Sequence, residues 1–290
     1  MEMNNSKFIA TFFNVCLFSL CVSSLVACDS KNKEQHDASS NIDSEKQQQT
    51  EILPFLNIQE QPAKYALPFC EKKNCIEMDI QTIQTQDAWM NQWIAESQSH
   101  VIQNQIGLNQ AMTLQQAINA YVKKSDAWQA EFKTNHAYEL HLNTRIASQR
   151  NQYVLLQVIV NSKQQSITVK DRGYFFVADR KLQKKLSLLD VIQNNQQNAL
   201  NEMIQVKYTE WQADQSSDVQ KAAPKKLYWG QSDWFFDGEG VGLHYRANEI
   251  VKDGTQLDVY LTKEQTAQVL RPEVLEKCSN FYKDRHCNIL

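Results

Sequence analysis

The stretch YVLLQVIV, residues 153–160, decides the fold because it is apolar on both faces of an extended chain. A strand that is buried on both faces reads as a continuous apolar run rather than an alternating one. We therefore predict that it is the central strand of a sheet. Residues 138–146 (YELHLNTRI) alternate apolar with polar side chains, which predicts a half-buried strand before it. Residues 167–178 (ITVKDRGYFFVA) predict a further strand, kinked near Gly173.

Helical periodicity appears on both sides of these strands. Residues 86–105 (QDAWMNQWIAESQSHVIQNQ) place apolar side chains on one face at helical spacing. Thr113 is expected to cap the next helix, whose apolar stripe begins at Leu114. Helical spacing returns over 199–211. Three short strands with glycines in the turns between them are expected to follow: 234–236, 241–245 and 257–261.

Helices and an antiparallel sheet that segregate along the chain are typical of an α+β fold. We expect an antiparallel sheet packed with helices. The strand and helix patterns divide the folded part into an N-terminal strand and helix region, residues 63–135, and a C-terminal α+β domain, residues 136–290.

Residues 1–27 have the pattern of a bacterial lipoprotein signal peptide. Lys7 precedes an apolar stretch, and small residues precede the cut site. The tetrad LVAC, residues 25–28, matches a lipobox, in which Cys28 is lipidated and becomes the first residue. The alternatives are an ordinary signal peptide or an uncleaved membrane anchor. A spanning helix needs about 20 predominantly apolar residues, and the stretch is marginal for that.

Residues 28–62 are predicted to be a disordered tether. The part from 29 to 49 is almost free of apolar side chains and cannot bury enough surface to offset its ordering entropy. Lipid on Cys28 would hold the chain to a membrane in the cell envelope of a bacterium, on the periplasmic or the outer-membrane side. Asp29 directly follows Cys28. An aspartate at this position retains lipoproteins in the inner membrane of enteric bacteria, but the rule does not hold for all bacteria, so the choice between inner and outer membrane stays open.

Four cysteines remain once the signal peptide and Cys28 are set aside: Cys70, Cys75, Cys278 and Cys287. An even number in an exported chain predicts disulfides. The local pairs Cys70–Cys75 and Cys278–Cys287 are the most economical, and a pairing that joins the start of the domain to its end stays open. A zinc site that includes His286 is the other alternative. Gaps of four and eight residues depart from the usual knuckle spacing, so we predict no metal.

The charge of the chain argues against a nucleic-acid partner. The 290 residues carry a formal net charge of −3, and lysines and arginines form no dense run. The sequence also lacks His-x-x-x-His, Gly-x-Ser-x-Gly and Gly-rich phosphate-loop motifs. We therefore predict no catalytic residue and no cofactor. His141 and His244 each lie in a strand pattern, where a solvent-facing or locally bonded imidazole is expected rather than a ligand.

Acidic and aromatic side chains gather in DWFFDGE, residues 233–239. Paired carboxylates near aromatic rings can bind or cut sugars, and aromatic anchors ringed by charge compose a binding hot spot. The predicted binding residues are Asp233, Trp234, Phe235, Asp237 and Glu239. In the alternative interpretation, the aromatic side chains of this hairpin belong to the hydrophobic core. Its Asp and Glu side chains then lie in turns and are exposed to solvent.

Several tracts resemble one known family. GYFF (173–176), KLSLLDV (185–191) and WFFDGEGVGLHY (234–245) resemble the strand, the helix start and the closing hairpin of the RsiV-like family. This domain of unknown function occurs in the extracellular part of anti-sigma factors that sense lysozyme, and in bacterial lipoproteins. WMNQWI (89–94) resembles the element that precedes it. Family members often carry a Gly-Gly-Ala-His tract where residues 168–173 here read TVKDRG.

The resemblance implies an RsiV-like domain over 136–290 and a lysozyme-like or peptidoglycan-related partner. Together with the lipid anchor and the missing catalytic motifs, it leads us to expect a non-catalytic binding module. One alternative is an envelope enzyme that acts on peptidoglycan through Asp237 and Glu239, whose carboxylates would then face a cleft. The other is a structural partner in an envelope complex.

Overall fold

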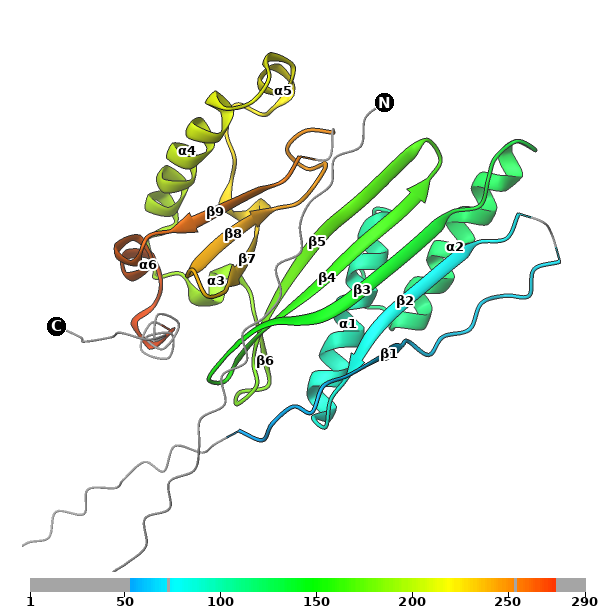
Figure 1. Cartoon of the computed structure of the whole chain (residues 1–290), viewed down its shortest axis with the longest axis horizontal. Coiled ribbons are helices and arrows are strands. Elements are labelled where there is room, and N and C mark those ends of the chain that lie inside the picture. The colour runs from blue at the N-terminus through cyan, green and yellow to red at the C-terminus, as the bar shows by residue number, and fades with distance from the viewer. Residues whose placement is uncertain (1–52, 72–73, 253–254, 275–290) are drawn as a thin grey trace, which may run out of the picture. The chain divides into compact units, whose positions relative to one another are not determined.

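The computed structural model describes residues 53–71, 74–252 and 255–274, which form two β-sheets with helices packed against them (Figure 1). The α+β fold class is confirmed. Cys28, Cys278 and Cys287 lie outside the described residues, as does the predicted signal peptide. Within the described ranges, no helix combines the length and the hydropathy needed to cross a membrane.

The larger sheet has its six strands in sequence order. They are β1 (Gln59–Pro62), β2 (Glu77–Gln84), β3 (Glu139–Arg150), β4 (Tyr153–Gln164), β5 (Ile167–Asp179) and β6 (Lys184–Leu186). All neighbours are antiparallel except β2 and β3, which run parallel because two helices connect them. The predicted central strand is confirmed, since β4 lies between β3 and β5 and Leu156 and Val158 are fully buried.

The sheet extends across the predicted boundaries in the chain. β1 lies inside the segment 28–62, which was predicted to be a disordered tether, and Leu56 just before it is buried. β2 comes from the predicted region 63–135 and pairs with β3 of the region 136–290. Strands of both regions therefore belong to one sheet.

The two connecting helices, α1 (Ala88–Gln105) and α2 (Leu114–Glu131), pack on each other and cover one face of the larger sheet (Figure 1). Both begin at a capping side chain. Asp87 accepts a hydrogen bond from the Met90 amide at 3.1 Å, and Thr113 forms a reciprocal capping box with Gln116. The predicted cap at Thr113 is confirmed.

A bulge lies close to the predicted kink in β5. The register between β4 and β5 shifts between Val160 and Ser162, and on the β5 side Asp171 has a left-handed φ of 50°. The Asp171 amide donates to the Asn161 side chain at 2.8 Å, which holds the extra residues in place. The bulge therefore falls two residues before Gly173 and increases the local twist of β5.

The smaller sheet consists of β7 (Asp233–Phe236), β8 (Val241–Tyr245) and β9 (Leu257–Leu261), all antiparallel. These are the three short strands that the sequence predicted. Its helices are α3 (Leu188–Val191), α4 (Gln197–Ala213), α5 (Ser217–Ala222), the 3₁₀ turn η1 (Trp229–Gln231) and α6 (Lys263–Val269). Leu200, Ile204 and Tyr208 of α4 are buried in the same apolar cluster as the strands.

Cys70 and Cys75 form a disulfide with their Cα atoms 6.0 Å apart, which confirms this predicted pair. The Asn74 side chain fixes the loop to the turn after α2, because it donates to the Asn135 carbonyl at 2.9 Å and accepts from the Ala137 amide at 2.9 Å.

Replacing Cys70 and Cys75 together with Ser should lower the free energy of unfolding by about 2–3 kcal/mol, since a short cross-link restricts the unfolded chain only modestly. Urea denaturation of the exported protein measures the loss. Thiol titration of the denatured, unreduced protein should find essentially no free cysteine. Four reactive thiols, or bound zinc in stoichiometric amount, would contradict the disulfide assignment.

Candidate functional site

A cleft of about 510 Å³ opens where α1, the end of β5, β6 and the start of β7 meet. Side chains from all four elements, together with α3 and η1, line it. The lining includes Trp93, His100, Phe176, Lys185, Trp229 and Trp234. A concave, mainly apolar cavity with a few convergent polar groups is the usual form of a ligand site. This cleft is therefore the candidate functional site.

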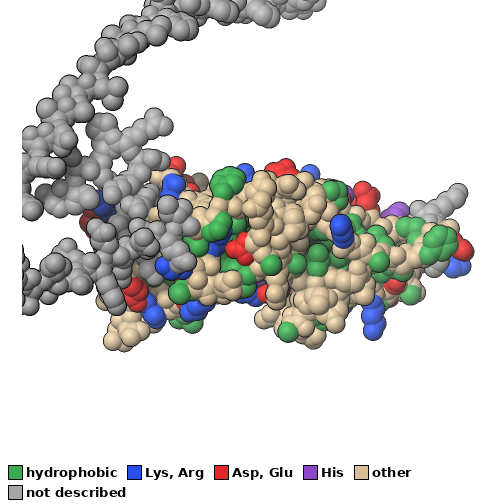
Figure 2. Space-filling model, turned by 90° about the horizontal axis from the view of Figure 1, so that it is seen from below, with side chains coloured by type: hydrophobic (Ala, Val, Ile, Leu, Met, Phe, Trp, Pro, Cys, Tyr) green, Lys and Arg blue, Asp and Glu red, His purple; other side chains and the backbone are tan. Residues whose placement is uncertain are grey.

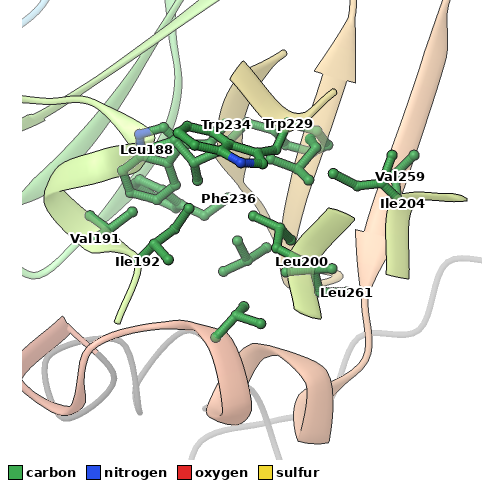
Figure 3. Packing of buried hydrophobic residues seen from close by; sticks show 14 of the residues in the cluster. Leu188, Val191, Ile192, Leu200, Ile204, Trp229, Trp234, Phe236, Val259 and Leu261 are labelled. Atoms are coloured by element: carbon green, nitrogen blue, oxygen red, sulfur yellow. The ribbon is translucent and has the colours of Figure 1, made fainter. Parts of the chain in front are cut away.

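The inner wall of the cleft is aromatic and almost fully buried. Trp229 and Trp234 are 8% and 5% exposed, and they lie beside Leu188 at the border of the apolar cluster (Figure 3). The Trp234 indole donates to the Leu186 carbonyl at 2.8 Å, which joins β7 to the end of β6. Because its only polar hydrogen is already bonded, Trp234 offers the cleft an apolar surface.

Glu96 of α1 and Lys185 of β6 both line the cleft and form a solvent-exposed ion pair. The hydrogen bond from Lys185 holds the pKa of the Glu96 carboxyl below its ordinary value. His100, one helical turn further along α1, contacts the Phe176 ring edge-on with 6.0 Å between ring centroids. Burial lowers the pKa of this imidazole, and the charges of Arg246 and Lys185 lower it further, so His100 is neutral at pH 7.

A second ion pair joins Asp233, which lines the cleft, to Arg246, which does not. The Asp233 carboxylate accepts a hydrogen bond from the Phe175 amide at 3.1 Å and lies 3.4 Å from Nη1 of Arg246. Arg246 also covers the Tyr174 ring, with its guanidinium carbon 4.7 Å from the centroid. Burial raises the pKa of Asp233 above its ordinary value, and the Arg246 charge partly offsets that rise. Asp233 thus joins β5 to the smaller sheet.

The structure divides the five predicted binding residues among three places. Asp233 and Trp234 line the cleft. Phe235 is 4% exposed and belongs to the core, as the alternative interpretation of the hairpin had it for the aromatic side chains. Asp237 and Glu239 lie at the turn between β7 and β8 and do not line the cleft.

Asp237 stabilises the hairpin. One carboxylate oxygen accepts from the amides of Glu239 at 2.8 Å and Gly240 at 3.3 Å, and the other accepts from the Tyr260 hydroxyl at 2.7 Å. These bonds close the turn and fasten it to β9. Glu239 is exposed to solvent.

Gly242 leaves room for the Phe235 ring. A Cβ atom on Gly242 would lie 2.4 Å from Cζ of Phe235. That ring cannot move away freely, because Phe175 and Tyr260 hold it at centroid distances of 5.2 and 5.3 Å.

Gly242→Ala should therefore lower the free energy of unfolding by about 1–3 kcal/mol, the usual cost of overpacking a core. Chemical denaturation followed by tryptophan fluorescence measures it. Gly238→Ala is the matched control, since a Cβ there meets nothing within 4 Å. Equal stability of the two variants would show that the Phe235 ring is free to shift.

His244 is bonded locally, which is one of the two states expected from its strand pattern. It lies between Asp233 of β7 and Asp258 of β9 in the strand register, and its Nδ1 is 2.6 Å from Asp258 Oδ1. The imidazole is 3% exposed, and its Nε2 faces Gly173 without a hydrogen-bond partner.

Among residues 53–71, 74–252 and 255–274, no group of three His, Cys, Asp or Glu side chains could hold a metal ion.

The fold is similar to that of two solved structures. A crystal structure of a DUF3298 family protein from Pseudomonas aeruginosa gives a TM-score of 0.59 at 15% identity, over 80% of this chain and 99% of that chain. The chain shares a fold with this protein. The structure of a DUF3298 family member from Bacteroides fragilis gives 0.52 at 13% identity, over 77% of this chain and 98% of the other. At these identities the likeness concerns the fold alone.

DUF3298 is a domain of unknown function, so the shared fold carries no activity with it. Comparison with protein-family models gives no match. Comparison with curated proteins gives no match either.

Proposed function

We propose that the chain is a lipid-anchored lipoprotein of the bacterial envelope that acts as a non-catalytic binding module for a lysozyme-like or peptidoglycan-related partner. The lipobox at residues 25–28 and the polar segment after it support the location. The cleft supports the binding role. It combines a preformed aromatic wall with polar groups whose charges are already paired.

The state of the acidic residues favours binding over hydrolysis. A glycosidase needs two carboxylates that flank the scissile bond and can exchange protons with it. Asp237 instead accepts three hydrogen bonds that hold the hairpin. In the cleft, Glu96 and Asp233 each face a basic side chain within the protein. Neither is placed as a free acid or base.

The surface charge of the folded part does not point to long-range steering of a partner. Acidic and basic side chains are interspersed on the face shown in Figure 2. A net charge of −3 is also too small to steer a large basic partner by itself. Recognition therefore has to come from local contacts, and the cleft offers aromatic and polar side chains for them.

The test is a pull-down with the chain from residue 29 onward, exported behind a cleavable signal peptide that is not lipidated. Insoluble peptidoglycan and an immobilised basic lysozyme serve as baits, each at low and at physiological salt. We expect at least one of them to retain the protein. No retention by either bait at either salt would refute the proposed function.

Two variants show whether the cleft is responsible. Leu189 is 55% exposed at the mouth of the cleft, so Leu189→Asp places a charge there without disturbing the core. Val206 is 58% exposed on α4 and does not line the cleft, so Val206→Asp is the matched control. Only the first change should weaken retention. Equal retention of both variants would keep the partner and discard the cleft as its site.

A further inference from the structure

We infer that one end of the larger sheet rests on the surface of the phospholipid bilayer to which the chain is anchored. The inference rests on the proposed function, because that function supplies the lipid anchor at Cys28. It is carried by three exposed apolar side chains at this end of the sheet and by the place where the chain enters the fold.

Three segments make up this end of the larger sheet, which we call the basal end (Figure 1). They are the β3–β4 turn at residues 151–152, the β5–β6 turn at residues 180–183 and the first described segment, residues 53–58. The Arg180 amide donates to the Gln152 carbonyl at 2.8 Å, which joins the two turns.

Buried contacts fix the first described segment to these turns. The Arg180 side chain donates through Nη2 to the Pro54 carbonyl at 2.9 Å, and Arg180 is 5% exposed. Leu56 is 2% exposed, and its carbonyl accepts from the Gln86 amide at 3.1 Å. The backbone on both sides of Phe55 is therefore held in place, and the three segments form one surface.

The basal end exposes three apolar side chains. Phe55 is 84% exposed, Leu182 is 63% exposed and Ile58 is 41% exposed. Single exposed apolar side chains are common on protein surfaces. Several on one surface indicate an interaction site, and aromatic and aliphatic side chains together suit the interface of a bilayer.

The anchor keeps the basal end close to the bilayer. Residues 29–52 connect Cys28 to Leu53, the first described residue. A chain of this length without fixed structure spans about 25–30 Å. A flexible link of this kind raises the effective concentration of the second contact to the millimolar range. A contact too weak to hold the free chain on a bilayer is therefore enough to orient the anchored one.

The basic side chains of the basal end contribute less than the apolar ones. Arg180 faces Asp87 at 3.8 Å, and Lys184 bonds to Asp190 at 2.6 Å, so these charges are paired within the protein. Paired charges gain little from headgroup phosphates. We therefore expect the apolar side chains to carry the contact.

The experiment places an indole ring at each end of the sheet and asks which one enters the bilayer. Phe55→Trp adds a ring at the basal end. Phe132→Trp is the matched control, because Phe132 is 64% exposed and lies between α2 and the start of β3, at the opposite end. The native tryptophans are the same in both proteins, so the added fluorescence reports the introduced ring.

The chain from residue 28 onward is exported without lipid and coupled through the Cys28 thiol to a maleimide phospholipid. This chemical anchor does not depend on lipidation in the cell. The vesicles consist of phosphatidylethanolamine and phosphatidylglycerol with brominated acyl chains, which quench an indole that enters the bilayer. The added fluorescence should be lost in Phe55→Trp and retained in Phe132→Trp.

A second pair of changes shows whether the neighbouring apolar side chain takes part. Leu182→Ser, added to Phe55→Trp, should weaken the contact about tenfold and restore most of the lost fluorescence, as expected for losing buried apolar area. Ile167→Ser is the matched control and should restore none. Ile167 is 60% exposed and begins β5, whose 13 residues separate it from the basal end by about 40 Å. Circular dichroism checks that each variant is folded.

The outcomes separate this inference from the proposed function. Equal quenching of the two introduced rings, or stronger quenching in Phe132→Trp, overturns the inference. Equal effects of Leu182→Ser and Ile167→Ser overturn it as well. The pull-down with peptidoglycan and lysozyme contains no bilayer, so it judges the function independently. A chain that shows selective quenching but is retained by neither bait keeps this inference and loses the proposed function.

Discussion

Replacing Cys28 with Ala should abolish lipid attachment completely. The thiol of Cys28 is the acceptor that the lipobox LVAC at residues 25–28 presents, and alanine has no group that can take its place. Several acyl chains on one residue anchor a protein stably, whereas one chain holds it only weakly. The variant should therefore accumulate as an uncleaved precursor or leave the membrane as a soluble product.

Metabolic labelling with a fatty acid measures this effect directly. The parent protein should carry the label, and Cys28→Ala should carry none. Cys21→Ala is the matched control, because Cys21 lies within the apolar stretch of the same signal and should leave labelling unchanged. A label that persists in Cys28→Ala would contradict the lipobox and with it the predicted anchor.

The sequence predicts the fold well where the signal for an element lies within the element itself. The continuous apolar run of β4 defines a buried strand, and the Thr113 cap with its apolar stripe defines α2. β1 shows the opposite case. Its sequence QEQP is polar, and it becomes a strand because its backbone pairs with β2. No local sequence pattern predicts such an edge strand. For this reason the predicted tether extends to residue 62 and includes β1.

The cleft was only partly predictable for a similar reason. Asp233 and Trp234 were found because acidic and aromatic residues that are adjacent in sequence form a visible cluster. The same cluster also suggested Asp237, whose carboxylate instead closes a turn. Glu96 and Lys185 come from segments 89 residues apart, and only the packing of α1 beside β6 brings them together. Neither residue has a neighbour in sequence that marks it as part of a site.

Phe236→Ala should lower the free energy of unfolding more than the disulfide and glycine variants do, by about 3–5 kcal/mol, as expected for removing a fully buried phenylalanine. Phe236 is 0% exposed and ends β7. It packs against Trp234 with 6.3 Å between ring centroids and belongs to the cluster that joins the smaller sheet to α3 and α4 (Figure 3). Removing the ring would leave a cavity between these layers.

Urea denaturation monitored by circular dichroism gives the change in the free energy of unfolding. Phe132 is 64% exposed at the end of α2, so Phe132→Ala is the matched control and should stay within about 0.5 kcal/mol of the parent. Because Trp234 lines the cleft and touches Phe236, the same variant should also weaken ligand binding in the fraction that stays folded. A loss of unfolding free energy below about 1 kcal/mol would mean that α3 and α4 fill the cavity left by the Phe236 ring. Unchanged ligand binding would mean that the aromatic wall of the cleft does not depend on Phe236.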